Sequence, residues 1–179
     1  MNKVDTLIVD KTGTLTEGKP TVEKIGSVAG DFNEETVLQY IISLNNQSEH
    51  PLAEATVKYG KEQGVKSLKA DGFNAVAGKG VEGTINSKKV ALGNAKMMEH
   101  AGAKIPSKLE QEAQTYQKQG KTVSYLAVRN EAVGFVVIGD KIKKTTAKAI
   151  KELLEHGIDV LMLTGDNEDT ARAVAEELG

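Results

Sequence analysis

The chain has 179 residues, of which 39% are hydrophobic and 27% are charged, so it has room for one large or two small globular domains. Its formal net charge of −2 gives no reason to expect nucleic acid or an anionic membrane surface as a partner. The absence of cysteine excludes disulfides and thiolate metal sites. No apolar run is long enough to span a bilayer and no secretory signal is visible, so we predict a soluble, cytoplasmic chain.

The first chemical feature follows the first predicted strand. The apolar run from Val4 to Val9 predicts a short buried strand, and Asp10-Lys11-Thr12-Gly13-Thr14-Leu15-Thr16 comes directly after it. In open α/β sheets, ligands bind beyond the carboxyl ends of the strands. An aspartate placed there is a plausible nucleophile toward a phosphoryl group, giving an aspartyl-phosphate. Gly13 permits a sharp turn, and the threonine hydroxyls can hold phosphate oxygens.

Thr12 indicates what would happen to that intermediate. A phosphatase working through an aspartyl-phosphate needs a second acid, which protonates the leaving group and later activates water. Thr12 stands two positions after Asp10, where such an enzyme would place that acid. Since a hydroxyl cannot donate a proton in the same way at neutral pH, we expect the acyl-phosphate to persist.

The heptad at 10–16 resembles the signature of the P-type ATPases, cation pumps that are phosphorylated on its aspartate. Such a match in a strand–loop context is more specific than a lone glycine motif, so we prefer it to a threonine-rich turn. The resemblance implies that Asp10, Lys11 and Thr12 are catalytic, and that Asp10 and Thr12 contribute to an Mg²⁺ site. It also implies a haloacid-dehalogenase-like fold with a nucleotide-binding domain inserted after the signature.

The predicted fold class is α/β, with two domains. Turn-forming residues at 17–21 are interpreted as the first connection out of the phosphorylation domain. Residues 22–131 combine helical spacing with alternating segments and are predicted to form the inserted nucleotide-binding domain, an α+β domain with an antiparallel sheet of about six strands flanked by helices. Residues 1–21 and 132–179 would form an incomplete Rossmannoid phosphorylation domain.

The segment Ser48-Glu49-His50-Pro51-Leu52 begins a predicted helix, with Ser48 as its cap and Pro51 at its first position. Taken alone, His50 is most simply an exposed loop histidine. A neutral imidazole can also stack on a purine, however, and Glu49 can accept a hydrogen bond from an exocyclic amino group. The segment resembles the Ser-x-His-Pro motif of the heavy-metal-transporting branch of these pumps. The resemblance implies that His50 binds adenine, and it favours copper over zinc or cadmium.

Residues 78–83, Gly-Lys-Gly-Val-Glu-Gly, satisfy the G-x-G-x-x-G pattern literally. We reject the dinucleotide interpretation because a β-like segment, not a helix, follows. A glycine-rich turn that lets a nucleotide approach the backbone fits better, and a plain flexible hairpin loop is the alternative. By resemblance, Gly78 and Gly80 match glycines that line the ATP site. Asn94 is a good helix N-cap on its own, and the resemblance adds a nucleotide contact.

The chain returns to the first domain near Asp140, which by resemblance matches the acidic residue of the second hinge. The buried run 160–163 then predicts a parallel strand that delivers Thr164-Gly165-Asp166-Asn167 to its carboxyl end. Thr164 and the backbone of Gly165 can bind a transferring phosphoryl group, and Asp166 can order a Mg²⁺ shell. The segment resembles the second phosphorylation motif of the family. The alternative is a simple turn with Asp166 or Asn167 as the helix cap.

These patterns predict the ATP-binding and phosphoryl-accepting part of a heavy-metal pump, with ATP and Mg²⁺ as cofactors. The implied partners are the pump's transmembrane and actuator domains, at the cytoplasmic side of the plasma (inner) membrane. We expect no nucleic-acid partner and no membrane insertion of the chain itself. A lysine and a Gly-Asp-Gly-x-Asn-Asp segment that should follow by resemblance do not occur. Because phosphoryl transfer needs metal and cation stabilisation, the chain is expected to bind ATP but to be catalytically incomplete.

Two other functions remain open at this point. A stand-alone haloacid-dehalogenase-type phosphatase with a cap domain would hydrolyse generic phosphate monoesters, although Thr12 argues against it. A non-catalytic nucleotide-binding module would bind ATP without forming an acyl-phosphate.

Overall fold

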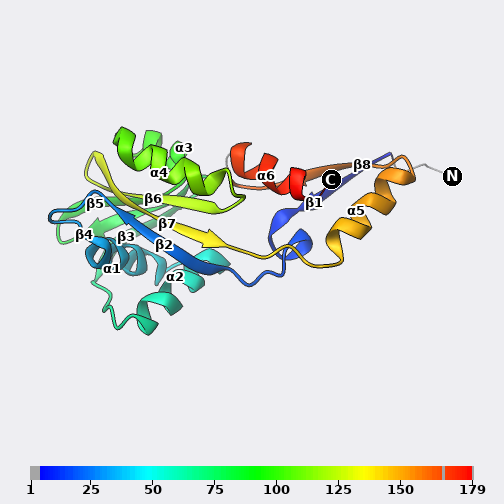
Figure 1. Cartoon of the computed structure of the whole chain (residues 1–179). Helices are drawn as coiled ribbons and strands as arrows, with labels where there is room; N and C mark the ends of the chain where they lie inside the picture. The colour runs from blue at the N-terminus through cyan, green and yellow to red at the C-terminus, as the bar shows by residue number, and fades with distance from the viewer. Residues whose placement is uncertain (1–4, 167, 179) are drawn as a thin grey trace.

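The computed structural model describes residues 5–166 and 168–178, so Val4 and Asn167 of the sequence predictions lie outside the described residues. The molecule is elongated and has two parts (Figure 1). A six-stranded sheet with its helices forms one end, and a two-stranded sheet with two further helices forms the other.

The two-stranded sheet positions both predicted phosphoryl motifs. β1 (Thr6–Asp10) and β8 (Asp159–Leu163) are parallel, and Asp10 pairs with Leu163. Because parallel strands end at the same edge, the segments after Asp10 and after Leu163 leave the sheet side by side. A helical turn (Lys11–Leu15) follows β1, and Gly13 adopts a φ of 78° within it, as the predicted sharp turn requires.

Both strands were predicted to be buried, but each is only half covered. Ile8, Leu161 and Leu163 are 59%, 56% and 62% exposed, while the alternate residues of both strands are half-buried. In a strand, successive side chains point to opposite faces, so the exposed residues share one face. The helices α5 (Thr146–Glu155) and α6 (Glu168–Leu178) complete this part of the described chain.

The larger sheet is antiparallel and confirms the prediction of about six strands. Its order in space is β2-β7-β6-β5-β4-β3. The strands β4 and β5 are joined by Asn86 and Ser87, both with positive φ, which is the backbone of the tight hairpin turn predicted there. The bounds of the strands are β2 (Thr21–Ser27), β3 (Ala70–Val76), β4 (Gly80–Ile85), β5 (Lys88–Gly93), β6 (Thr122–Val128) and β7 (Glu131–Gly139).

The predicted domain boundary at 131/132 disagrees with the pairing of β7. This strand pairs with β6 on one side and with β2 on the other. Residues 132–139 therefore belong to the six-stranded sheet and not to the part that carries Asp10. The sequence placed the boundary at the hairpin before β7, but the chain leaves the sheet only after Gly139.

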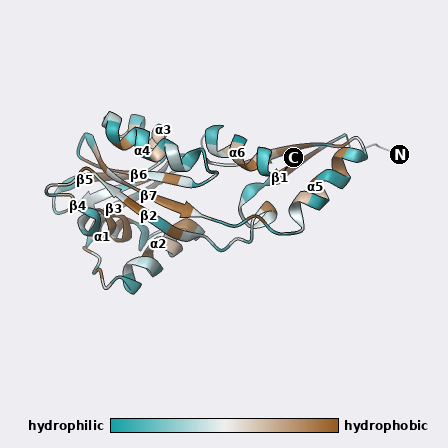
Figure 2. Cartoon of the chain, in the orientation of Figure 1, coloured by the Kyte–Doolittle hydropathy of each residue, from teal (hydrophilic) through white to brown (hydrophobic). Residues whose placement is uncertain are grey.

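Helices cover both faces of this sheet. Helices α1 (Glu34–Asn45) and α2 (Pro51–Glu62) belong to one side, and α3 (Ala95–His100) and α4 (Ser107–Gln117) to the other. Along β7, Val136 and Ile138 belong to the hydrophobic cluster that includes the buried residues of α1. Phe135 and Val137 belong to the cluster on the other face, which includes the buried residues of α4. A strand buried on both faces reads as a continuous apolar run, and Figure 2 shows this along β7.

Candidate functional site

The two parts of the molecule enclose a cavity of about 490 Å³ between them. Its walls come from the segment after β1, the start of α2, the β3–β4 loop, the ends of β5 and β6, α4 and the segment after β8. Nine of the predicted site residues line it, namely Lys11, Thr12, His50, Gly78, Gly80, Asn94, Thr164, Gly165 and Asp166.

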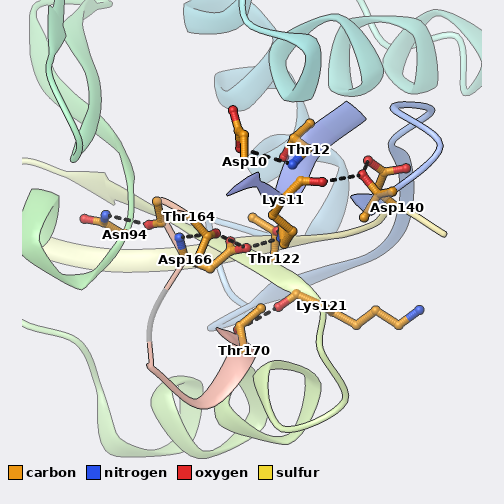
Figure 3. A network of polar contacts seen from close by, with 12 residues as sticks. Asp10, Lys11, Thr12, Asn94, Lys121, Thr122, Asp140, Thr164, Asp166 and Thr170 are labelled. Atoms are coloured by element: carbon orange, nitrogen blue, oxygen red, sulfur yellow. Dashed lines mark hydrogen bonds and ion pairs between the residues drawn. The ribbon is translucent and has the colours of Figure 1, made fainter. Parts of the chain in front are cut away.

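Lys11 and Asp166 form a buried ion pair at the wall of this cavity (Figure 3). Their side chains are only 7% and 8% exposed. Lys11 Nζ also donates to Thr122 Oγ1 at 3.2 Å, and Thr164 Oγ1 donates to Asp166 Oδ2 at 3.0 Å. The pair therefore joins the segments after β1 and β8 to the first residue of β6, in the other part of the molecule.

Asp10 lies apart from this pair. Its carboxylate is exposed, accepts a hydrogen bond from the Thr12 backbone N–H at 3.3 Å, and does not line the cavity. In Figure 3 its side chain points away from Asp166. The heptad thus places its lysine in the cavity wall and leaves its aspartate exposed outside the cavity.

Asp140 links the two segments through which the chain passes between the two parts of the molecule. Thr16 Oγ1 donates to Asp140 Oδ2 at 2.6 Å, and the backbone N–H of Lys19 donates to Asp140 Oδ1 at 3.1 Å. Lys143 Nζ adds a bond to the carbonyl of Gly13 at 2.8 Å. The predicted second hinge is therefore hydrogen-bonded to the first connecting segment.

His50, rather than Ser48, caps helix α2. The Nδ1 atom of His50 accepts a hydrogen bond from the Leu52 backbone N–H at 3.2 Å, and Pro51 occupies the first helical position as predicted. Since Nδ1 is an acceptor, the neutral ring carries its proton on Nε2. His50 lines the cavity, but Glu49 is exposed and does not.

Asn94 connects three segments of the site. Its side-chain oxygen caps α3 by accepting from the Met97 backbone N–H at 3.1 Å, as the sequence predicts. Its amide group donates to the carbonyls of Gly78 at 2.9 Å and Gly165 at 3.4 Å. The β3–β4 loop and the segment after β8 therefore lie within reach of a single side chain.

The structure adds cavity residues that the sequence analysis missed. Thr122, Gln117 and Tyr125 line the cavity from β6 and α4, and burial raises the pKa of Tyr125 to about 12, so its hydroxyl stays protonated at neutral pH. Their only sequence signal is a polar residue inside an apolar pattern, which is too common to identify a site.

The described residues contain no group of three or more His, Cys, Asp or Glu side chains that could hold a metal ion. Mg²⁺ needs only one or two carboxylates when substrate phosphates complete its oxygen shell. The exposed Asp10 carboxylate fits that requirement, whereas Asp166 is engaged by Lys11.

Across the described part of the chain, each helix falls short of the length and apolar character that a membrane span requires.

Comparison with protein families places these observations in context. A family model described as haloacid dehalogenase-like hydrolase matches residues 4–179. The chain is 46% identical to a copper-transporting P-type ATPase of Rhizobium leguminosarum bv. viciae, over 99% of this chain and 21% of the relative. It is 45% identical to a copper-exporting P-type ATPase of Legionella pneumophila, over 100% of this chain and 24% of the relative. A silver exporting P-type ATPase of Salmonella typhimurium is 42% identical over 100% of this chain and 22% of the relative.

Solved structures give the same relationship. The catalytic domain of the CPx-ATPase CopB-B, from work on its conformational changes upon nucleotide binding, matches with a TM-score of 0.72 and 29% identity, over 98% of this chain and 58% of that one. A zinc-transporting PIB-type ATPase in the E2.Pi state matches with a TM-score of 0.64 and 30% identity, over 98% of this chain and 28% of that one. The chain spans less than a quarter of the length of the curated relatives described above. It belongs to the haloacid dehalogenase-like hydrolase family and, as its Asp10–Thr16 signature predicts, is homologous to the heavy-metal P-type ATPases.

Proposed function

We propose that the chain binds ATP and accepts its γ-phosphoryl group on Asp10, as part of a heavy-metal pump. The observation that carries this proposal is the cavity, which joins His50, the loop of Gly78 and Gly80, and the Thr164–Asp166 segment in one space beside the Asp10 strand. A nucleoside triphosphate is long enough to reach all three segments, with its base beside His50 and its phosphates beside the donors of the Thr164–Asp166 segment.

Different residues bind different parts of the nucleotide. The imidazole of His50 stacks on or contacts the adenine. The backbone near Gly78 and Gly80 receives the phosphate chain. Thr164, Gly165 and Lys11 hold the γ-phosphoryl group through hydroxyl, backbone and ammonium donors. Lys11 must be shared between Asp166 and the phosphoryl oxygens, since its ammonium is bound to that carboxylate.

Transfer is an in-line displacement. An Asp10 carboxylate oxygen donates an electron pair to the γ-phosphorus, the bond to the β-phosphate oxygen breaks, and ADP leaves with that electron pair. Asp10 and Thr12 are the residues that would hold Mg²⁺, which would supply charge neutralisation at the transferring group. Because Asp10 does not line the cavity, the connections around Asp140 must let it approach the bound nucleotide.

The wider assignment follows from the relatives. Copper is the favoured cargo because the relatives from Rhizobium and Legionella are named for copper, although the Salmonella relative is named for silver. Transmembrane and actuator domains of the pump are the proposed partners, with this chain on the cytoplasmic side of the plasma (inner) membrane. We further propose that the inserted nucleotide-binding domain comprises residues 21–139, with residues 1–20 and 140–179 belonging to the phosphorylation domain.

An ATP titration followed by NMR on the labelled chain tests the proposal. We expect chemical-shift changes at His50, Gly78, Gly80, Asn94 and Gly165, and their loss in His50→Gln, because glutamine cannot stack as an imidazole does. His156→Gln, at the exposed end of α5, is the matched control and should bind as the unsubstituted chain does. Failure to bind at millimolar ATP would remove the basis of the proposal. Glu49 provides a finer test, since its position outside the cavity leads us to expect smaller shifts there.

The two roles of Asn94 can be separated by substitution. Asn94→Ala should lower the free energy of unfolding by about 1 kcal/mol through loss of the α3 cap, and should weaken ATP binding. Asn94→Asp keeps a capping oxygen but cannot donate to the Gly78 and Gly165 carbonyls. We therefore expect Asn94→Asp to recover stability in urea unfolding but not ATP affinity. Recovery of both would mean that the amide bridge has no part in the site.

Nucleotide binding without phosphoryl transfer is the second candidate function. It is favoured by the engagement of Lys11 with Asp166 and by the position of Asp10 outside the cavity. Acid-quenched labelling with γ-labelled ATP distinguishes the two, because only transfer leaves a hydroxylamine-sensitive label that Asp10→Asn removes. Turnover of a generic phosphate monoester would instead favour a phosphatase.

A further inference from the structure

Of the described charged side chains on the cavity wall, some form ion pairs and others do not. Two lysines, Lys11 and Lys79, line the cavity against three carboxylates, Glu110, Asp166 and Asp169. The ammonium of Lys11 is bound to Asp166. Lys79 has no ion pair or side-chain hydrogen bond to any described residue. Among the described cavity residues, Lys79 therefore carries the one lysine ammonium that no carboxylate neutralises.

The backbone around Lys79 is held in place. Its N–H donates to the carbonyl of Val76 at 3.0 Å, and its own carbonyl accepts from the backbone N–H of Asn94 at 3.0 Å. Asn94 in turn binds the carbonyls of Gly78 and Gly165. The half-buried Lys79 is therefore anchored beside the Thr164–Asp166 segment, at the end of the cavity where the phosphoryl group is expected.

We propose that Lys79 binds the phosphate chain of the nucleotide, an inference that rests on the proposed function. A polyanionic ligand entering a cavity with more carboxylates than free cations is opposed unless a cation compensates, and Lys79 lines the cavity without a described counter-ion. An ammonium on a flexible stem suits phosphate oxygens as a point charge without a fixed geometry. Lys79 thereby makes the site selective for phosphorylated nucleosides over the nucleoside itself.

Isothermal titration of ATP, ADP and adenosine into Lys79→Met and Lys79→Arg tests this role. We expect Lys79→Met to weaken ATP and ADP binding about tenfold, the loss of one charge-assisted contact, and to leave adenosine binding unchanged. Lys79→Arg should retain most of the ATP affinity. Lys96→Met is the matched control, because Lys96 is an exposed lysine on α3 that does not line the cavity.

The outcomes separate this inference from the proposal beneath it. If the unsubstituted chain binds ATP and Lys79→Met binds it equally well, the phosphate contact is wrong and the proposed function stands. If Lys79→Met weakens adenosine as much as ATP, Lys79 supports only the shape of the loop, and the inference is again overturned. If the unsubstituted chain binds neither ATP nor ADP, the proposed function fails and the inference fails with it.

Discussion

Replacing Asp166 with alanine is expected to lower the free energy of unfolding by about 3 kcal/mol, because the substitution leaves the ammonium of Lys11 buried without its carboxylate. Lys11 would keep only Thr122 Oγ1 as a described acceptor. A neutral hydroxyl does not compensate a charge that is 7% exposed. Urea unfolding of the two proteins, compared at their midpoints and slopes, measures the loss.

A double-mutant cycle tests the cause of this loss. The cycle compares Lys11→Met, Asp166→Ala and the double variant. The double variant removes both charges, so it should be more stable than Asp166→Ala alone. Thr122→Val removes a single hydrogen bond to Lys11 and should cost about 1 kcal/mol. If Asp166→Ala proves as mild as Thr122→Val, then the pair is solvated in solution and does not hold the two parts together.

Gly80→Ala is expected to destabilise the chain by about 3 kcal/mol and to reduce ATP binding with it, since φ at this residue is +155° and a Cβ would lie 2.7 Å from the Cα of Gly93. L-residues rarely adopt this φ, and the obstacle is backbone, which cannot rotate away as a side chain can. Both Gly80 and Gly93 line the cavity, so relief of the contact changes its wall.

Gly78→Ala is the matched control for this prediction. Gly78 also has a positive φ, +69°, but apart from its two chain neighbours no described residue has an atom within 4 Å of the position of its Cβ. It should therefore lose only about 1 kcal/mol, the conformational cost of the left-handed region. Thermal unfolding and ATP titration of both variants decide the matter, and equal effects would contradict the close approach of the loop to β5.

Local chemistry in the sequence determined much of this protein. The Asp10–Thr16 heptad and the Thr164–Asp166 segment were identified as the ends of parallel strands, and the pairing of Asp10 with Leu163 has that arrangement. The Asn86-Ser87 turn, the Asn94 cap and Pro51 at the start of α2 were also predicted correctly. The turn, the cap and the position of the proline depend on residues within a few positions of one another, so a single stretch of sequence contains the information for each of them.

Burial and long-range contacts were decided only by the tertiary structure. Ile8 and Leu161 are apolar, yet they are exposed because one face of β1 and β8 is uncovered among the described residues. β7 belongs to the six-stranded sheet because it pairs with β6, as a hairpin pattern indicates, and also with β2, which no local pattern indicates.

The candidate site shows the same division. Sequence motifs named Lys11, His50, Asn94 and Asp166 separately, but they contain no information on which of them meet. Lys11 contacts Asp166 across 155 positions and Thr122 across 111. The sequence alone therefore determined the chemical groups and their places on strands and turns. Only the tertiary structure decided that Lys11 binds Asp166 and that Asp10 stays outside the cavity, because these depend on packing between segments distant in the chain.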